Sequence, residues 1–440
     1  MENLRKNYAI ITYGCQMNIH ESEKLAGILT EKGYSSTEKL EEADIIVFNT
    51  CCIRENAEDR AEGNIGALKK LKRSNKNLII AVGGCMAQQK GFADKFLKSF
   101  PYVDIVFGTH NLEEFGSLLD KKIASKKKVV DVWEEEKSIK EGVPKFRTSY
   151  PNAWVNITYG CNNFCTYCIV PYVRGRERSR KLDDIVDECK SLILEGYKEI
   201  TLLGQNVNSY GKDLQNVNFG ILIDEISKID GKFRLRFMTN HPKDLTEELV
   251  HVISRSDKVC KSIHLPIQAG SNRILKMMNR HYTRDEYLEK IKYLRKHIPD
   301  ISITTDVMVG FPTETEEDFL DTYSLMEKVG FSGAFTFIYS PREGTPAAKY
   351  DGQIPEEVSK KRIMKLIDLQ NNLNREQSRE YLNKTVEILC EGFDEKKKMY
   401  LGRDTYGRMA YFSSVDNLIG KFVNVKITKT GGISLIGEIV

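Results

Sequence analysis

The chain has 440 residues, of which 41% are hydrophobic and 29% are charged, and its formal net charge is only +4 at pH 7. These values are typical of a globular protein of about three domains. No stretch reaches the roughly 18 apolar residues of a membrane span, and residues 1–13 contain no apolar signal region. The composition therefore excludes a membrane protein and gives no general electrostatic argument for nucleic-acid binding.

We accordingly expect a cytoplasmic protein with no membrane partner, and a monomer. Cysteines in the cytoplasm stay reduced. The 10 cysteines of the chain are therefore expected to bind metal or do chemistry rather than to form disulfides.

The N-terminal part of the chain, residues 5–122, alternates predicted strands with predicted helices. Apolar strands are expected over residues 7–15, 44–51 and 78–85, and a helix over residues 18–32 follows the first of them. This alternation predicts an α/β domain, in which a parallel sheet has helices packed on its faces.

Each of these strands ends in a cysteine: Cys15, Cys51 or Cys85. Because open α/β sheets bind ligands at the carboxyl ends of their strands, these distant residues are predicted to converge at one edge. We interpret them as ligands of an iron–sulfur cluster, and buried structural cysteines are the alternative. The neighbouring Cys52 is expected to point elsewhere. Packing roles are expected for the isolated cysteines, Cys189, Cys260 and Cys390.

The rest of the chain divides into three segments. Residues 123–146 are charged and aperiodic, which predicts a linker. Residues 147–377 contain about six predicted βα units, typical of an incomplete TIM-like barrel, a (β/α)6 arrangement. Its strands are expected over residues 153–159, 198–203, 234–239, 262–267, 302–309 and 333–339. Residues 378–440 predict a small β-barrel with strands over residues 386–389, 399–403, 409–412, 422–430 and 434–439.

The loop after the first of these barrel strands contains Cys161, Cys165 and Cys168. Three thiolates at this spacing are too close for three independent disulfides, and no histidine lies nearby to complete a zinc site. Soft thiolates select iron, so the loop predicts a [4Fe-4S] cluster whose fourth iron is free to hold a ligand. The basic run Arg174–Lys181 follows this loop, and its position favours contact with nucleic-acid phosphates.

The spacing of these cysteines, with the aromatic Tyr167 before the last of them, resembles the cluster motif of the radical S-adenosylmethionine (radical SAM) enzymes. The order of the three domains resembles the methylthiotransferases of that superfamily, whose last module is called a TRAM domain. Three segments resemble the branch of the family that modifies tRNA: Tyr13–Asn18, Asn49–Asn56 and Tyr339–Thr345. Within that branch, the pair Gln16-Met17 resembles the enzymes that act on N6-isopentenyladenosine.

The resemblance implies an enzyme that attaches a methylthio group to C2 of N6-isopentenyladenosine beside the tRNA anticodon. It implies two [4Fe-4S] clusters and S-adenosylmethionine, which serves as radical source and as methyl donor. A 5′-deoxyadenosyl radical removes the hydrogen from C2 in this family, and the second cluster presents methylated sulfur to the carbon radical. The implied partners are the tRNA and an electron donor such as flavodoxin or ferredoxin.

The resemblance also implies roles for residues, although no catalytic side chain is assigned. Six cysteines are implied ligands: Cys161, Cys165 and Cys168 for the radical cluster and Cys15, Cys51 and Cys85 for the auxiliary one. Candidate cofactor contacts lie near the radical cluster or at the ends of barrel strands: Tyr167, Arg174, Gly204, Gln205, Asn206, Arg236, Gln268 and Asp306. A loop cap or strand-end hydrogen bond is the alternative for the polar ones, and a cap is expected of His241. The target base and its apolar tail are expected to meet Gln16, Met17 and Asn18.

Two kinds of alternative remain open. In other branches of the family the same chemistry acts on threonylcarbamoyl-adenosine of tRNA or on an aspartate of a ribosomal protein. A non-catalytic iron–sulfur protein for RNA binding or electron transfer is the alternative from a different class. The polar and glycine-rich strand ends argue against the latter, because electron transfer alone needs no such site.

Overall fold

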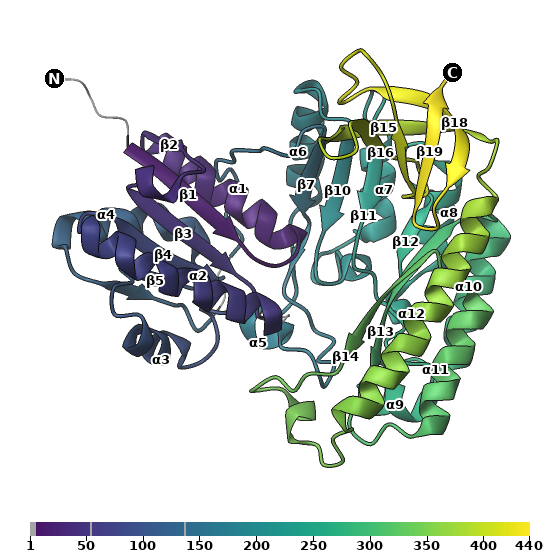
Figure 1. The fold of residues 1–440 in the computed structure, drawn as a ribbon, viewed down its shortest axis with the longest axis horizontal. Helices are drawn as coiled ribbons and strands as arrows, with labels where there is room; N and C mark the ends of the chain where they lie inside the picture. Colours follow the sequence, from purple (N-terminus) through teal and green to yellow (C-terminus); the bar gives the residue numbers. More distant parts are fainter. Residues whose placement is uncertain (1–5, 53–54, 136–137) are drawn as a thin grey trace. The chain divides into compact units, whose positions relative to one another are not determined.

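The computed structural model describes residues 6–52, 55–135 and 138–440 and divides the chain into two compact units (Figure 1). The first unit consists of Met1–Thr148, Tyr159–Asn162 and Cys168–Arg178. The second unit consists of Ser149–Thr158, Asn163–Tyr167 and Ser179–Val440. Within the described residues, no helix is both long and apolar enough to cross a lipid bilayer.

The first unit is built on a six-stranded parallel sheet in the order β2-β1-β3-β4-β5-β6, which confirms the predicted α/β domain. Its strands are β1 (Lys6–Thr12), β2 (Tyr34–Ser36), β3 (Ile45–Thr50), β4 (Ile79–Gly84), β5 (Ile105–Phe107) and β6 (Val129–Asp131). Its α-helices are α1 (Gln16–Glu31), α2 (Glu55–Ser74), α3 (Phe92–Ser99), α4 (Phe115–Ser125) and α5 (Val170–Arg174). Two 3-10 helices, η1 (Leu40–Glu42) and η2 (Leu112–Glu114), complete it.

Helices cover both faces of this sheet. Ile46 and Phe48 of β3 pack on one face with residues of α2 and α3, whereas Ile45 and Val47 pack on the other face with residues of α1 and α4. Successive residues of a strand point to opposite faces, so a strand between two helical layers is apolar on both sides. This explains why every residue of β3 is buried.

The predicted linker, residues 123–146, contributes to this unit in its described part. Its strand β6 pairs with β5 at the edge of the sheet. The backbone around Pro144 lies so close to Gly27 of α1 that a Cβ there would come within 2.3 Å of the Pro144 carbonyl oxygen. The prediction of a segment without regular structure was wrong at β6, because a strand of 3 residues is too short to give a periodic pattern.

The second unit contains six parallel strands in two three-stranded sheets, β7-β10-β11 and β12-β13-β14. An isolated parallel bridge between Leu235 and Val259 continues the first sheet toward β12. This is the predicted incomplete (β/α)6 barrel. Its strands are β7 (Asn152–Asn156), β10 (Glu199–Leu203), β11 (Arg234–Phe237), β12 (Ser262–His264), β13 (Ser302–Val309) and β14 (Gly333–Ile338). Two strands of two residues, β8 (Thr158–Tyr159) and β9 (Arg178–Ser179), lie in the segments where the chain changes unit.

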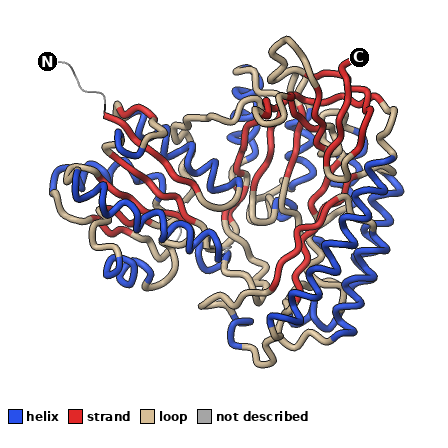
Figure 2. The backbone as a smooth tube through the Cα atoms, viewed as in Figure 1, coloured by secondary structure: helices blue, strands red, loops and turns tan. Residues whose placement is uncertain are grey.

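Helices separate these strands in sequence and cover their outer face (Figure 2). The α-helices are α6 (Leu182–Leu194), α7 (Phe219–Ser227), α8 (Glu247–Arg255), α9 (Asn272–Met277), α10 (Arg284–His297), α11 (Glu316–Val329) and α12 (Glu356–Arg379). The 3-10 helices are η3 (Val207–Ser209), η4 (Pro242–Asp244) and η5 (Pro346–Lys349). Ile303 and Val307 of β13 pack in the core, whereas the alternating Thr304, Asp306 and Met308 stay partly exposed. The two sides of β13 therefore differ, with one side in the hydrophobic core and the other only partly buried.

The C-terminal residues form the predicted small β-barrel, which is closed in the order β15-β16-β17-β19-β18. Its strands are β15 (Thr385–Asp394), β16 (Met399–Arg403), β17 (Met409–Phe412), β18 (Phe422–Thr430) and β19 (Ser434–Ile439). Only β15 extends beyond its predicted bounds. Alternation of apolar and polar residues between turns gave the other bounds correctly.

A buried ion cluster connects this β-barrel to the (β/α)6 strands. Glu199 at the start of β10 has no exposed surface, and Arg236 of β11 binds its carboxylate through Nε and Nη2, both at 3.1 Å. Arg403 of β16 donates to the same carboxylate at 3.0 Å. Although burial alone raises the pKa of Glu199, Arg236 and Arg403 lower it below its ordinary value. The C-terminal barrel is therefore packed as part of the second unit.

Glu199→Gln is expected to lower the free energy of unfolding by about 3–5 kcal/mol, because it leaves buried Arg236 without a carboxylate. Anaerobic denaturant unfolding of the cluster-loaded protein measures this loss. The matched control is Glu225→Gln, which removes a carboxylate that pairs with Lys228 at the surface of α7 and is expected to change stability little. Equal shifts of the two variants would contradict the structural role of the cluster.

Candidate cluster and cofactor sites

All 10 cysteines lie in the described parts of the chain, and no disulfide joins any of them there. The three expected to have packing roles, Cys189, Cys260 and Cys390, are buried. Apart from Cys52, the other six cysteines are the members of the two predicted triads.

The first triad, Cys15, Cys51 and Cys85, follows the three neighbouring strands β1, β3 and β4 at the same edge of the sheet. Glycines allow these strand ends to approach one another. Gly14 has φ +122° and a Cβ there would lie 2.7 Å from the Cβ of Cys51. Gly84 has φ +94° and a Cβ there would lie 2.4 Å from the carbonyl oxygen of Thr50. Side chains are excluded at both positions.

Two buried asparagines fix the loops that carry Cys15 and Cys51. The Cys15 thiol donates to Asn18 Oδ1 at 3.4 Å, and Asn18 Nδ2 donates to the carbonyl of Thr50 at 3.1 Å. Asn49 Nδ2 in turn donates a hydrogen bond to the backbone carbonyl of Asn18 at 2.8 Å. The amide of Asn18, expected to read a base edge, is therefore used inside the protein.

The other two residues expected at the base differ in exposure. Met17 is buried, with 4% of its surface exposed, so it does not offer its side chain to an apolar tail at the surface. Gln16 and Ile19 are exposed on the same first turns of α1. Residues 53 and 54 of the segment Asn49–Asn56 lie outside the described residues.

Arg174 lies beside the first triad and not at the end of a barrel strand, which corrects its predicted place. Its Nε donates to the sulfur of Cys85 at 3.2 Å. Its two terminal nitrogens bind the carboxylate of Glu21 on α1, with Nη2 at 3.1 Å from Oε2. All three side chains are buried. The first residue of the predicted phosphate-binding run is thus enclosed in an ion pair.

Cys52 also contacts this triad, and the expectation that it points elsewhere was wrong. Its thiol is hydrogen-bonded to Cys85. This bond from Cys52, together with the charge of Arg174, lowers the pKa of Cys85 to about 7 in spite of burial. The environment therefore favours a thiolate, which is the form that binds iron.

The second triad lies in the loop Cys161–Cys168, where Cys161 and Cys165 are buried and Cys168 is half-buried. The segment after α9 holds this loop. Thr166 donates from its backbone N–H to Met278 at 3.1 Å, and the side chain of Asn279 donates to the carbonyls of Asn163 and Phe164 at 3.2 and 3.0 Å. These bonds fix a loop that has little regular structure of its own.

Arg280, in the same segment, was not found by sequence reasoning. Its guanidinium is buried and donates to the sulfur of Cys165 at 3.4 Å and to the hydroxyl of Tyr167 at 3.5 Å. It also donates to the carbonyl of Pro266 at 2.9 Å and to the hydroxyl of Tyr282 at 3.2 Å. The contact between Arg280 and Cys165 joins residues 115 positions apart, so no local sequence pattern predicts it.

Buried polar atoms without partners gather at the carboxyl ends of β7, β10 and β11. Side chains there with a buried polar atom that lacks a hydrogen bond include Asn156, Thr158, Asn206, Asn208 and Asn240. Each such atom costs about 1–3 kcal/mol if nothing binds it, so a group of them marks a place for a polar ligand. Gly204 lies among them, and a Cβ there would come within 2.4 Å of Thr158 Oγ1. Gly204, Gln205 and Asn206 are therefore in the predicted position, directly after β10.

Gln268, four residues beyond the end of β12, lies beside Asp306 of β13 and forms an isolated parallel bridge with Val307. The backbone N–H of Gln268, a residue with φ +63°, donates to the carbonyl of Asp306 at 2.9 Å. The carboxylate of Asp306 lies 3.3 Å from Nε2 of His264 on β12. The ring of His241 accepts from the N–H of Lys243 at 3.3 Å, which confirms the predicted cap, and burial lowers its pKa.

Arg236 does not join this group, because its donors bind Glu199, Ser262 and the carbonyl of Asp404 at the C-terminal barrel. Arg236 was predicted to contact the cofactor at a barrel-strand end, and this prediction was wrong because the side chain faces the C-terminal barrel instead. Arg180 of the predicted phosphate-binding run is also buried, and it donates to the Asn156 carbonyl and to Glu188, both at 2.8 Å.

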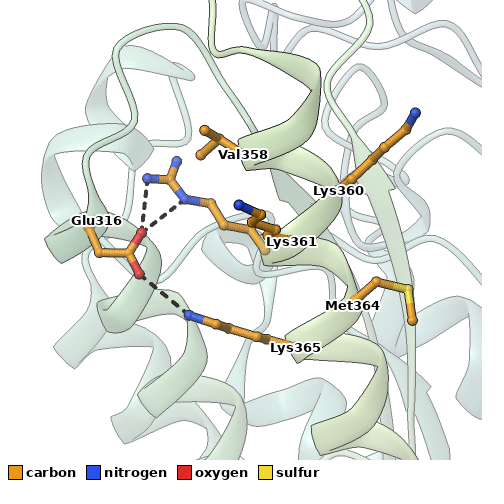
Figure 3. A pocket seen from close by; sticks show the side chains of 7 residues that line it. Glu316, Val358, Lys360, Lys361, Met364 and Lys365 are labelled. Atoms are coloured by element: carbon orange, nitrogen blue, oxygen red, sulfur yellow. Dashed lines mark hydrogen bonds and ion pairs between the residues drawn. The ribbon is translucent and has the colours of Figure 1, made fainter.

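A surface pocket on α12 lies apart from these residues. It is lined by charged side chains together with Val358 and Met364. Glu316 of α11 binds Arg362 at 3.2 Å and Lys365 at 3.6 Å there (Figure 3). None of the predicted cofactor contacts lines this pocket, so we assign no cofactor to it.

The donor sets of both triads fit iron–sulfur clusters. Among the described residues, no group of three or more histidine, cysteine or carboxylate side chains is placed to hold a single metal ion. A [4Fe-4S] cluster instead takes each thiolate on a different iron. Each triad offers three cysteines outside any disulfide, and an arginine donates to one sulfur of each triad. Hydrogen bonds to ligand sulfurs are typical of such sites.

Comparisons with known proteins agree with this division of the chain. Residues 7–108 match the family described as "Uncharacterized protein family UPF0004", residues 155–326 match the Radical SAM superfamily, and residues 379–440 match the TRAM domain. Two solved structures share the fold. The methyltransferase TsrM of Kitasatospora setae has a TM-score of 0.58 at 13% identity, covering 78% of this chain and 74% of that one. OxsB has a TM-score of 0.53 at 14% identity, covering 92% and 66%.

Curated relatives match over the whole length. The chain is 52% identical over 438 residues to the tRNA-2-methylthio-N(6)-dimethylallyladenosine synthase of Clostridium perfringens, covering 99% of this chain and 98% of the relative. It is 53% identical over 443 residues to the synthase of the same name from Thermoanaerobacter pseudethanolicus, covering 100% and 94%. The chain therefore belongs to the tRNA-2-methylthio-N(6)-dimethylallyladenosine synthase family of radical SAM proteins.

Proposed function

We propose that this protein attaches a methylthio group to C2 of N6-dimethylallyladenosine beside the anticodon of tRNA. The identity to synthases of this name over the whole chain supports the reaction. The observation that carries it is the presence of two cysteine triads, one at the strand ends of a parallel sheet and one in a barrel loop. A reaction that both generates a radical and delivers sulfur needs two such sites.

In this proposal, different cysteines of the chain hold the two clusters. Cys161, Cys165 and Cys168 hold one [4Fe-4S] cluster, and Cys15, Cys51 and Cys85 hold the other. When bound, the clusters and S-adenosylmethionine supply electron transfer, radical formation and the methylated sulfur. The cofactor contacts that we retain are Tyr167, Gly204, Gln205, Asn206, Gln268 and Asp306.

The strand-end amides bind the polar groups of S-adenosylmethionine, in this proposal. Asn156, Asn208 and Asn240 join the contacts predicted from the sequence because their buried polar atoms need partners. Gly204 lets the cofactor approach the backbone closely. A small low-potential carrier such as flavodoxin or ferredoxin supplies electrons, and the protein acts as a monomer in the cytoplasm.

Discrimination between substrates tests this function. A pocket that buries about four carbons of the dimethylallyl group favours the prenylated adenosine by roughly 2–3 kcal/mol, or about a hundredfold. We therefore expect prenylated anticodon stem-loops to be methylthiolated about a hundred times faster than bare ones in the anaerobically reconstituted enzyme, measured by mass spectrometry of the nucleosides. Stem-loops with threonylcarbamoyl-adenosine serve as the matched control. Equal rates on prenylated and bare RNA, or a preference for the control, would contradict the assignment.

A further inference from the structure

Each cysteine triad has one buried arginine that donates to a ligand sulfur, but the two arginines differ in charge balance. Arg174 donates to Cys85, and its charge is matched by the carboxylate of Glu21. Arg280 donates to Cys165, and its other partners among the described residues are two tyrosine hydroxyls and a carbonyl. Arg280 therefore has no carboxylate as counter-charge.

A buried charge without a counter-ion is strongly unfavourable, and the partners of Arg280 among the described residues are the Cys165 sulfur, two tyrosine hydroxyls and a carbonyl oxygen. Burial leaves 4% of Arg280 exposed, which keeps water from screening the interaction. Addition of one electron makes a cluster more negative and forms no new bond. A fixed neighbouring cation favours that reduced state, and hydrogen bonds to ligand sulfurs act in the same direction.

We propose that Arg280 is a positioning residue that raises the reduction potential of the cluster held by Cys161, Cys165 and Cys168. The paired charges of Arg174 and Glu21 leave the potential of the other cluster much less affected. The chain thereby directs an electron from a low-potential carrier preferentially to the cluster beside Arg280. The inference rests on the proposed function for the presence of the clusters and goes beyond it in assigning their redox order.

The test measures potentials in full-length protein in which Cys15, Cys51 and Cys85 are alanine, so that one cluster contributes to the spectrum. Arg280→Met is expected to lower the ratio of reduced to oxidised cluster at least tenfold at a fixed potential, which is about 59 mV for one electron. Arg280→Lys keeps a positive charge and is expected to restore most of that difference. Electron paramagnetic resonance at poised potentials reads out the reduced fraction.

The comparison variant is Glu21→Gln with Arg174→Met, in protein whose Cys161, Cys165 and Cys168 are alanine. This double variant removes an ion pair that has no net charge. Its reduced fraction is therefore expected to change less than that of Arg280→Met. An unchanged potential in Arg280→Met, with full iron content, would overturn the inference and leave the proposed function intact. Absence of iron from the parent protein would instead overturn the cluster assignment and with it the proposed function.

Iron content separates a redox role from a purely structural one. If Arg280→Met and Arg280→Gln lose the cluster while Arg280→Lys keeps it, the cluster needs the cation as its counter-charge, which supports the inference. If Arg280→Lys also loses the cluster, the guanidinium acts by holding the loop through Pro266 and Tyr282, and the inference is overturned.

Discussion

Replacement of Cys161, Cys165 and Cys168 together by alanine is expected to remove about half of the bound iron and to abolish cleavage of S-adenosylmethionine. Half of the iron is lost because two clusters of the same type share it. Cleavage is lost because three protein ligands leave one iron open for the cofactor, and the variant lacks all three thiols of the loop Cys161–Cys168. Iron and sulfide counting and release of 5′-deoxyadenosine under anaerobic reduction measure the two effects.

Cys189→Ala is the matched control for this triple variant. Cys189 is buried in the hydrophobic core of the second unit. Its loss removes one core side chain and no predicted ligand, so iron content and cleavage are expected to stay at the level of the parent protein. Full iron content in the triple variant would contradict the ligand assignment of the loop.

The larger elements of the fold were predictable because their sequence patterns are local. The strands β3 and β4 are almost entirely buried, since helices cover both faces of the sheet, and β18 and β19 alternate in burial as half-buried strands do. The strands β2, β5 and β6 were missed. Each has 3 residues, which is too few to repeat the two-residue alternation of a strand.

The two cysteine triads could be recognised from the sequence, because one has a diagnostic spacing and the other follows strand ends, and their role as cluster ligands stays a prediction. Arg280 was not, since its contact with Cys165 joins distant parts of the chain. Arg174 and Arg236 were assigned to the barrel ends because they follow or belong to barrel strands. The position of an arginine in the sequence does not show which partner its long side chain reaches. Arg174 binds the buried carboxylate of Glu21, and Arg236 binds that of Glu199.

Cys52→Ala is the control that separates ligands from neighbours in the first triad. The Cys52 thiol is hydrogen-bonded to Cys85, and Cys52 follows Cys51 in the sequence. Chemical labelling of thiols alone therefore does not distinguish Cys52 from the proposed ligands. Cys52→Ala removes one hydrogen bond to Cys85 and is expected to retain full iron and measurable methylthiolation. Loss of half of the iron in this single variant would show that Cys52 is itself a ligand.

Replacement of Cys15, Cys51 and Cys85 together by alanine is expected to separate the two halves of the reaction. The variant should again lose about half of the iron, while 5′-deoxyadenosine is still released because the loop Cys161–Cys168 is intact. Methylthiolated nucleoside should fall below detection by mass spectrometry, since the sulfur-bearing site has no ligands. If sulfur insertion persisted, the strand-end triad would be structural. If cleavage of S-adenosylmethionine were lost as well, with half of the iron retained, the two sites would depend on each other in a way that separate ligand sets do not require.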